Sequence, residues 1–205
     1  MDTAIRAFCV IILLINNAES QILQFGACPI VETVKYFDIE RFLGQWHVLE
    51  RYPVWYEDSG QCSSKRIETC GRRVEIEYTF VQEGVQYVLK MNSTYKPGDE
   101  AIFYIQDNRI DPISVPVNVI ATNYIDYALI YGCKVSPNYN IKYTVAWILS
   151  RNKFLPEQTL QFLRLELNAI PYTSPAYLKL VSHDEESCTY HWTANIQAPD
   201  IDEEE

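Results

Sequence analysis

The stretch Phe37–His47 reads FDIERFLGQWH and decides how the rest of the chain can fold. Asp38 can cap a single helical turn through Phe42, because its carboxylate can accept a hydrogen bond from an otherwise unpaired backbone N–H. Gly44 permits a backbone angle or a close approach that a side chain would forbid. Trp46 then opens an extended run that favours a strand. We therefore expect a short helix that closes one end of the structure and a strand that leaves it.

Beyond Trp46 the chain is a series of short extended segments. In 74–80 and 85–91 apolar side chains occupy every second position, which is the period of a strand with one apolar face. Glu83-Gly84 between them is typical of a hairpin turn, and segments with proline or glycine separate the others. The sequence predicts strands at 46–52, 61–69, 74–80, 85–91, 100–107, 115–122, 126–135 and 143–150.

Eight consecutive strands with short links fit a closed up-and-down barrel, although a two-sheet sandwich would also fit the spacing. Ala101–Ile105 and Tyr127–Tyr131 are apolar on both faces, so one face can line a cavity while the other packs under a helix. That helix is predicted from Pro156 to about Asn168, with leucines at helical spacing. The predicted fold is all-β: an eight-stranded antiparallel up-and-down β-barrel with one C-terminal α-helix packed outside.

The N-terminal segment 1–20 has the features of a secretory signal peptide. The apolar run Phe8–Ile15 follows Arg6, and small residues precede Gln21. This run is too short to span a bilayer. We therefore expect a secreted, extracellular protein whose barrel domain comprises residues 21–192.

Acidic residues dominate the charge, and the formal net charge is −10. Five acidic side chains lie in 200–205, so residues 193–205 are predicted to form an acidic disordered tail. No basic face offsets this charge, so we expect no nucleic-acid partner. The pairs Lys65-Arg66 and Arg72-Arg73 are interpreted as exposed hairpin residues. Without an apolar C-terminal tail, no stable membrane insertion is expected.

Cysteines and one sequon add to the evidence for the secretory route. Asn92-Ser93-Thr94 is the only N-x-S/T sequon, which predicts an exposed, glycosylated Asn92. In an oxidising compartment an odd number of cysteines leaves one thiol over, and the sequence alone does not give the pairing. Once residues 1–20 are removed, the cysteines are Cys28, Cys62, Cys70, Cys133 and Cys188.

Three separated pieces of the chain together resemble the lipocalin family. They are Gly44-Gln45-Trp46, Thr122-Asn123-Tyr124 and the AWILSR segment 146–151. The resemblance covers roughly residues 26–192 and, within the family, is strongest to apolipoprotein D and to insect Lazarillo-like and bilin-binding proteins. In lipocalins these motifs meet at the closed end of the barrel. The residues that the resemblance places there are Gly44, Trp46, Thr122, Tyr124 and Arg151.

The resemblance also implies the disulfides Cys28–Cys133 and Cys62–Cys188, which would leave Cys70 as a free thiol. Cys62–Cys70 is the alternative, because it is a local pairing. A free Cys70 near a hairpin tip could link two chains into a dimer or be inert. The sequence departs from the family at Asn123, where Asp is usual; the amide keeps hydrogen-bonding capacity.

Strand alternation predicts which side chains face the barrel interior. A glycan on Asn92 requires that side chain to face out, so Tyr87, Leu89 and Met91 on the same strand should face in. Arg151 lies four residues beyond Trp147, and its guanidinium could stack on Trp46 across the barrel floor. No independent observation orients the strands of the two tyrosines at 78 and 131. The predicted lining is Tyr78, Tyr87, Leu89, Met91, Tyr131, Tyr143, Val145 and Trp147.

Such a lining is apolar with a few phenol groups, which suits a flat or chain-like lipophile with one polar end. The predicted function is binding and transport of a small hydrophobic ligand, a fatty acid, sterol, retinoid or bilin, with no other cofactor. The alternatives are a pigment (biliverdin)-binding protein and a protein-interaction module that uses loops around Val54-Trp55-Tyr56. The aromatic residues could also fill the barrel as a solid core.

Catalytic and metal sites are not indicated by the sequence. His47, His183 and His191 are scattered and lack metal-ligand spacing, and neither a phosphate loop nor a nucleophile elbow occurs. The enzymatic precedent that the resemblance brings, the lipocalin-type prostaglandin D synthase, uses a cavity thiol. Cys70 at a turn is poorly placed for such a thiol-dependent isomerase, so we expect no enzyme activity.

Overall fold

The computed structural model describes residues 22–54, 56–57, 59–70, 73–95, 101–105 and 113–197, without the side chains of Leu23 and Cys70. The predicted signal peptide, residues 1–20, and the acidic end of the chain, residues 198–205, lie outside this range.

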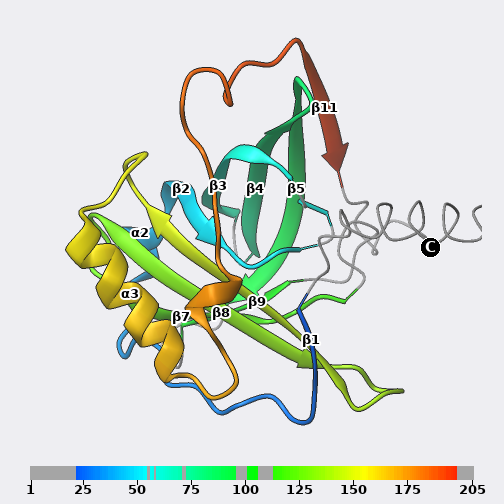
Figure 1. The fold of residues 1–205 in the computed structure, drawn as a ribbon, viewed down its shortest axis with the longest axis vertical. Helices are drawn as coiled ribbons and strands as arrows, with labels where there is room; N and C mark the ends of the chain where they lie inside the picture. Colours follow the sequence, from blue (N-terminus) through cyan, green and yellow to red (C-terminus); the bar gives the residue numbers. More distant parts are fainter. Residues whose placement is uncertain are drawn as a thin grey trace, which may run out of the picture.

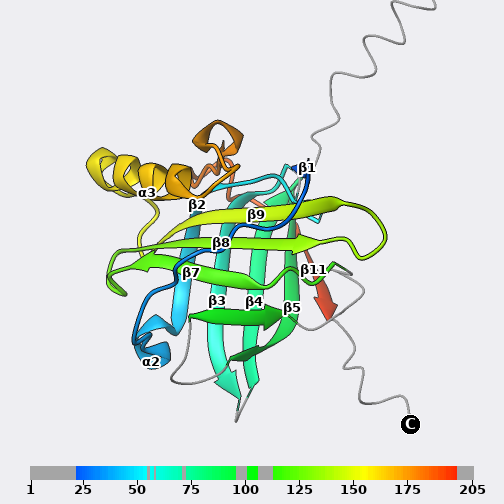
Figure 2. The same cartoon turned by 90° about the horizontal axis from the view of Figure 1, so that it is seen from below.

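Eight antiparallel strands form a closed barrel (Figures 1 and 2). Each strand pairs with the next in sequence, and β2 pairs with β9 to close the ring, with His47 opposite Ser150 and Arg51 opposite Trp147. The predicted barrel is therefore confirmed, with strand ends that shift by a few residues. The strands are β2 (Gly44–Arg51), β3 (Gln61–Cys70), β4 (Arg73–Gln82), β5 (Val85–Tyr95), β6 (Ile102–Ile105), β7 (Val117–Thr122), β8 (Tyr127–Val135) and β9 (Ile141–Ser150).

Three further strands, which the sequence pattern did not indicate, pair with free edges of the barrel. β1 (Leu23–Phe25) pairs with β9 and β10 (Lys179–Leu180) with β2, both antiparallel. β11 (Trp192–Gln197) runs parallel to the first half of β5, along the edge that the short β6 leaves uncovered (Figure 1). The predicted boundary at residue 192 is therefore wrong, because residues 193–197 form strand rather than tail.

Helix α3 (Glu157–Ala169) packs outside the barrel, across β7 and β8 (Figures 1 and 2). Its Leu163 and Leu167 are fully buried against outward-facing side chains of the barrel strands, among them Leu129 and Ile148. The predicted helix and its apolar stripe are confirmed. β8 and β9 are thus buried on both faces, one toward the helix and one toward the barrel interior.

The short helix α2 (Ile39–Phe42) covers one end of the barrel (Figure 2). The Asp38 carboxylate accepts a hydrogen bond from Arg41 N at 3.2 Å, as the sequence predicts. Gly44 has a φ of +95°, which a side chain would strain. Trp46 is fully buried, and its Nε1 donates to Phe42 O at 2.8 Å, so the helix and the strand that follows it share one hydrogen bond.

Arg151 joins the segments that meet at this end. Its guanidinium lies 3.6 Å from the centroid of the Trp46 ring, which confirms the predicted stacking. Its nitrogens donate to Gln45 O at 2.8 Å, Arg41 O at 3.0 Å and Tyr124 O at 3.3 Å. One side chain therefore satisfies carbonyl groups of α2, β2 and the β7–β8 turn.

The β7–β8 turn is held by its own side chains. Thr122 Oγ1 donates to Tyr127 O at 2.7 Å and accepts from Tyr124 N at 2.9 Å. Asn123 Oδ1 accepts from three successive backbone N–H groups, at residues 125–127, so the amide does the work of the carboxylate usual in the family. The Tyr124 hydroxyl accepts from Asp38 N at 3.2 Å, which links this turn to α2.

Two disulfides, Cys28–Cys133 and Cys62–Cys188, connect residues 105 and 126 positions apart. Both pairings implied by the family resemblance are confirmed, and the local alternative Cys62–Cys70 is not formed. Cys70 ends β3; its thiol and the dimer through it remain predictions. Asn92 on β5 lies next to the buried Met91, and the glycan on Asn92 also remains a prediction.

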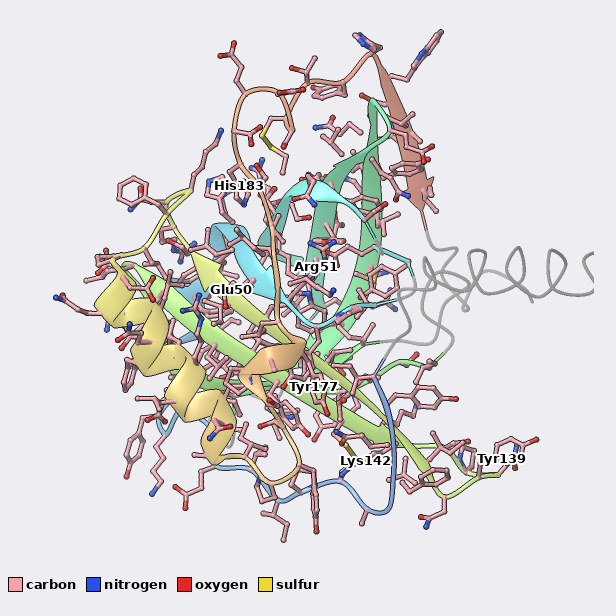
Figure 3. All side chains as sticks on the ribbon, in the orientation of Figure 1. Glu50, Arg51, Tyr139, Lys142, Tyr177 and His183 are labelled. Atoms are coloured by element: carbon pink, nitrogen blue, oxygen red, sulfur yellow. A yellow bond between two sulfur atoms is a disulfide. The ribbon has the colours of Figure 1, made fainter. Side chains whose placement is uncertain are left out.

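The segment that follows β10 lies against β2 and brings two histidines together. His183, which is labelled in Figure 3, donates from Nε2 to Val48 O at 2.8 Å. The centroids of the His183 and His47 rings lie 5.4 Å apart in an edge-to-face arrangement. These histidines, which are far apart in the sequence, are therefore not scattered in the fold. Burial lowers the pKa of both imidazoles, and the charge of nearby Lys153 acts in the same direction.

Replacement of Arg151 by Met should lower the free energy of unfolding by about 2–3 kcal/mol, because several backbone carbonyls lose their donor and Trp46 loses its cation. Urea unfolding followed by circular dichroism measures the change. Arg66→Met is the matched control, since Arg66 is exposed and pairs with the exposed Glu68; we expect an effect below about 0.5 kcal/mol there. Equal effects of the two substitutions would contradict the central role of Arg151.

The histidine pair should make stability depend on pH. A histidine whose pKa is lower in the folded than in the unfolded chain binds its proton more weakly when folded, so the free energy of unfolding should fall as the pH drops below the ordinary value of 6.5. The double variant His47→Gln/His183→Gln should have a smaller slope between pH 7.5 and pH 5 in urea unfolding. His191→Gln, at an exposed position, should keep the wild-type slope; an unchanged slope in the double variant would refute the prediction.

Candidate functional site

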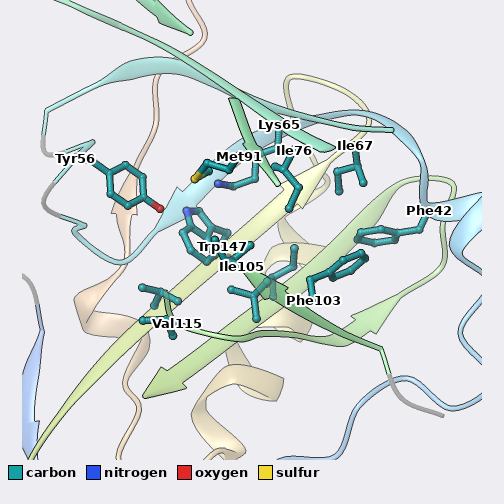
Figure 4. Close-up of a pocket in the computed structure, with 13 residues that line it drawn as sticks. Phe42, Tyr56, Lys65, Ile67, Ile76, Met91, Phe103, Ile105, Val115 and Trp147 are labelled. Atoms are coloured by element: carbon teal, nitrogen blue, oxygen red, sulfur yellow. The ribbon is translucent and has the colours of Figure 1, made fainter. Parts of the chain in front are cut away.

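The barrel encloses a cavity of about 50 Å³ (Figure 4). Apart from Lys65 and the hydroxyl of Tyr56, the side chains around it are apolar. Most come from alternate positions of β3–β9, as expected for inward-facing residues of a barrel. The lining residues are Phe42, Tyr56, Lys65, Ile67, Ile76, Met91, Phe103, Ile105, Val115, Val117, Ile130, Val145 and Trp147.

Most of the residues predicted to line the cavity lie inside the barrel. Met91, Val145 and Trp147 line the cavity itself. Four others belong to the same inner cluster without reaching the cavity: Tyr78 and Leu89 are buried, and Tyr87 and Tyr143 pack against them from partly exposed positions. The direction inferred from an outward-facing Asn92 therefore agrees with the side-chain arrangement on β5.

Tyr131 is the exception, and its predicted place in the lining is wrong. Ile130 lines the cavity, while Tyr131 points outward into the cluster under α3 with Leu163 and Leu167. Burial there raises its pKa. The error has a physical origin: β8 is buried on both faces, so alternation alone cannot tell its inward-facing from its outward-facing side chains.

One end of the cavity is aromatic and closed. The Phe42 and Phe103 rings stack with centroids 6.1 Å apart, and Phe42 also contacts Trp46 at 5.1 Å (Figure 4). Phe37 packs edge-on against both phenylalanines. Of the predicted closed-end residues, Trp46 packs against Phe42, which lines the cavity, and none of the five lines the cavity itself.

The opposite end carries polar groups. Tyr56, Met91, Lys65 and Trp147 converge there from the β2–β3 connection, β5, β3 and β9 (Figure 4). The Tyr56 ring also contacts Tyr78 at 6.4 Å. Of the residues named in the interaction-module alternative, Val54 is buried, and Tyr56 lines the cavity while staying partly exposed. Trp55, the third residue of that alternative, lies outside the described residues.

The pair Lys65-Arg66 was interpreted as exposed, and the structure shows that this is wrong for Lys65. Only 7% of Lys65 is accessible, and its Nζ lies 3.8 Å from the Tyr78 ring centroid and 4.3 Å from that of Trp147. Arg66, by contrast, faces solvent. Alternation along β3 carries the signal that sequence reasoning missed, because Lys65 shares a face with the apolar Ile67.

A buried ion pair lies beside this end of the cavity. Arg51 Nε contacts Glu57 Oε1 at 2.9 Å, and both side chains are almost fully buried; Arg51 is labelled in Figure 3. Arg51 Nη2 also donates to Glu57 O at 2.7 Å and Gly60 O at 2.8 Å, which holds the β2–β3 connection against the barrel. Burial raises the pKa of Glu57, while the charges of Arg51 and Lys65 act in the opposite direction.

Among the described residues, one cluster has a composition that could hold a metal ion, but its ligand groups are not available. Cys62, His183 and Cys188 place their ligand atoms within 4.8 Å of one another. The two cysteines form a disulfide, so neither supplies the thiolate that a metal ion needs. Among the described residues, no helix is both long and apolar enough to span a membrane.

Comparison with known proteins agrees with this architecture. Insecticyanin-B of Manduca sexta is 27% identical over 199 residues, which cover 93% of this chain and 95% of the relative. Apolipoprotein D of Cavia porcellus is 29% identical over 158 residues, which cover 74% of this chain and 80% of the relative. The solved structure of insecticyanin from the tobacco hornworm has a TM-score of 0.75 at 24% identity and covers 86% of this chain and 96% of that one.

A family model supplies the assignment. The model described as the lipocalin / cytosolic fatty-acid binding protein family matches residues 43–165, which contain all of the barrel strands and most of α3. This match, the closed barrel and the three motifs at its floor agree with the resemblance noted in the sequence. The chain therefore belongs to the lipocalin / cytosolic fatty-acid binding protein family.

Proposed function

We propose that this protein binds a small hydrophobic molecule reversibly inside its barrel and carries it in the extracellular space, without catalysing a reaction. The observation that carries the proposal is the apolar cavity above the closed end, lined by side chains from most of the barrel strands. Family membership supports the same function. Selectivity would arise from the few polar groups at the Tyr56 end.

The size of the cavity favours a slender ligand. A volume of about 50 Å³ is far below the ~300 Å³ of a site for a drug-sized molecule, so binding requires side chains to move apart. Met91 is unbranched and can adapt its shape, and Tyr56 lies on a connection rather than on a strand. A flexible chain can enter in this way with smaller rearrangements than a rigid tetrapyrrole, so a fatty acid-like ligand is favoured over a bilin.

Burial of the ligand sets the expected affinity. Removing about 300 Å² of apolar surface from water contributes about 7 kcal/mol, before the costs of lost motion and of opening the cavity. Before these costs, this burial alone corresponds to a dissociation constant of about 10 μM, so micromolar binding requires further polar or packing contacts that offset them. An extracellular location is supported by the two disulfides, which persist in oxidising compartments.

Filling the cavity should abolish binding. Ile130→Phe enlarges a lining side chain, and we expect it to raise the dissociation constant for the best ligand about tenfold or more. Calorimetric titration with a fatty acid, a sterol, a retinoid and biliverdin measures the affinities, and near-ultraviolet circular dichroism checks the fold of the variant.

The matched control is Ile125→Phe, at a position that is 67% exposed in the β7–β8 turn, where binding should stay within about twofold of wild type. A folded wild-type protein that binds none of the four ligands would refute the carrier proposal. Tight, stoichiometric binding of biliverdin alone would replace it with a pigment-binding function.

A further inference from the structure

We infer that β11 is a self-association surface, through which two copies of this chain form a dimer with one sheet continuous across the pair. The inference starts from the position of β11 at the margin of the sheet (Figure 1). One edge of β11 pairs with the first half of β5, and among the described residues no strand pairs with its other edge. Backbone N–H and C=O groups of alternate residues therefore point outward along a free edge.

β11 lacks the features that normally keep an exposed strand edge from pairing. The other marginal strands, β1 and β10, have three and two residues, whereas β11 has six. Folded proteins keep their edge strands short or protect them with charged side chains or proline. The β11 sequence WTANIQ contains neither a charged residue nor a proline. This edge is therefore open to another strand.

Apolar side chains on one face of β11 are exposed. Strand alternation places Trp192, Ala194 and Ile196 on one face and Thr193 and Asn195 on the other. Trp192 is 75% exposed and Ile196 is 40% exposed. The fold of one chain therefore leaves two large apolar side chains of this face partly in water, and a second strand beside β11 would cover them.

The order of side chains along β11 is self-complementary about Ala194. In an antiparallel pair with its two-fold axis at Ala194, Trp192 lies opposite Ile196 of the partner subunit, and Thr193 lies opposite Asn195 of the partner subunit. Aromatic–aliphatic and polar pairs are both favourable across strands. Because a two-fold interface is isologous, each pair occurs twice. A register shifted by one residue would instead place both large apolar side chains opposite polar ones.

The acidic end of the chain favours the antiparallel arrangement. Five acidic side chains lie in 200–205, shortly after β11. In a parallel pair the two acidic segments would leave the sheet side by side and repel each other, whereas in an antiparallel pair they leave at opposite ends. Each copy offers one free edge of β11, so the pairing uses both edges and the assembly stops at two chains.

The small size of this contact predicts reversible association. It comprises one pair of six-residue strands and the two large apolar side chains that each copy contributes. Such a contact is smaller than the interface of a stable dimer, so we expect a dissociation constant of roughly 10–100 μM. The dimer does not involve Cys70, so it should form without an intermolecular disulfide.

Sedimentation analysis of the Cys70→Ser variant over a range of concentrations tests the inference. We expect a reversible monomer–dimer equilibrium. Ala194→Lys and Ala194→Glu each place two like charges opposite each other at the axis, so each should weaken the dimer about tenfold or more. An equimolar mixture of these two variants should dimerise again, because a lysine then faces a glutamate.

The matched controls are Leu165→Lys and Leu165→Glu, which add the same charges at a position on α3 that is 68% exposed. They should leave the dissociation constant of the dimer unchanged within about twofold. A chain that stays monomeric at the highest concentration would overturn the inference. So would dimers that the Ala194 substitutions do not weaken, or Ala194 variants that associate no better when mixed than alone.

Discussion

The stacking of Arg151 on Trp46 is the interaction on which the barrel depends. Trp46 comes from the first barrel strand and Arg151 follows the last, so their contact at 3.6 Å lies where the sheet closes on itself. The same guanidinium donates hydrogen bonds to α2, to β2 and to the β7–β8 turn. One side chain therefore holds together both the point where the sheet closes into a barrel and the segments that cover this end of it. The end of the barrel next to α2 is closed by this contact.

Local sequence patterns predicted the helix-to-strand segment at the closed end and the hairpins well, because each of these residue patterns favours a single local conformation. Asp38 caps a helix, Gly44 requires a positive φ, and Glu83-Gly84 forms a hairpin in which both residues have positive φ. The inward direction of β5 was also predictable, since Met91 and Asn92 differ in polarity. Where polarity distinguished the two faces of a strand, alternation placed side chains correctly.

The failures occurred where polarity did not distinguish the faces or where backbone pairing dominated. Tyr131 lies on a strand that is buried on both faces, so polarity does not tell which of Ile130 and Tyr131 points into the barrel. β11 pairs with an edge left open by the short β6, and main-chain hydrogen bonds rather than an apolar pattern hold it there. Lys65 was misjudged because charge usually signals exposure, whereas its β3 neighbour Ile67 signals the interior.

The misjudged lysine shows how the polar end of the cavity is built. An inward-facing position on a barrel strand is most easily filled by an apolar side chain, because a buried ammonium group must be stabilised by its surroundings. Here the Tyr78 and Trp147 rings contribute that stabilisation, and the carboxylate of the buried Glu57 interacts favourably with the same group. The polar end of the cavity therefore depends on charges that compensate one another within the fold, whereas the other end is lined by the apolar rings of Phe42 and Phe103.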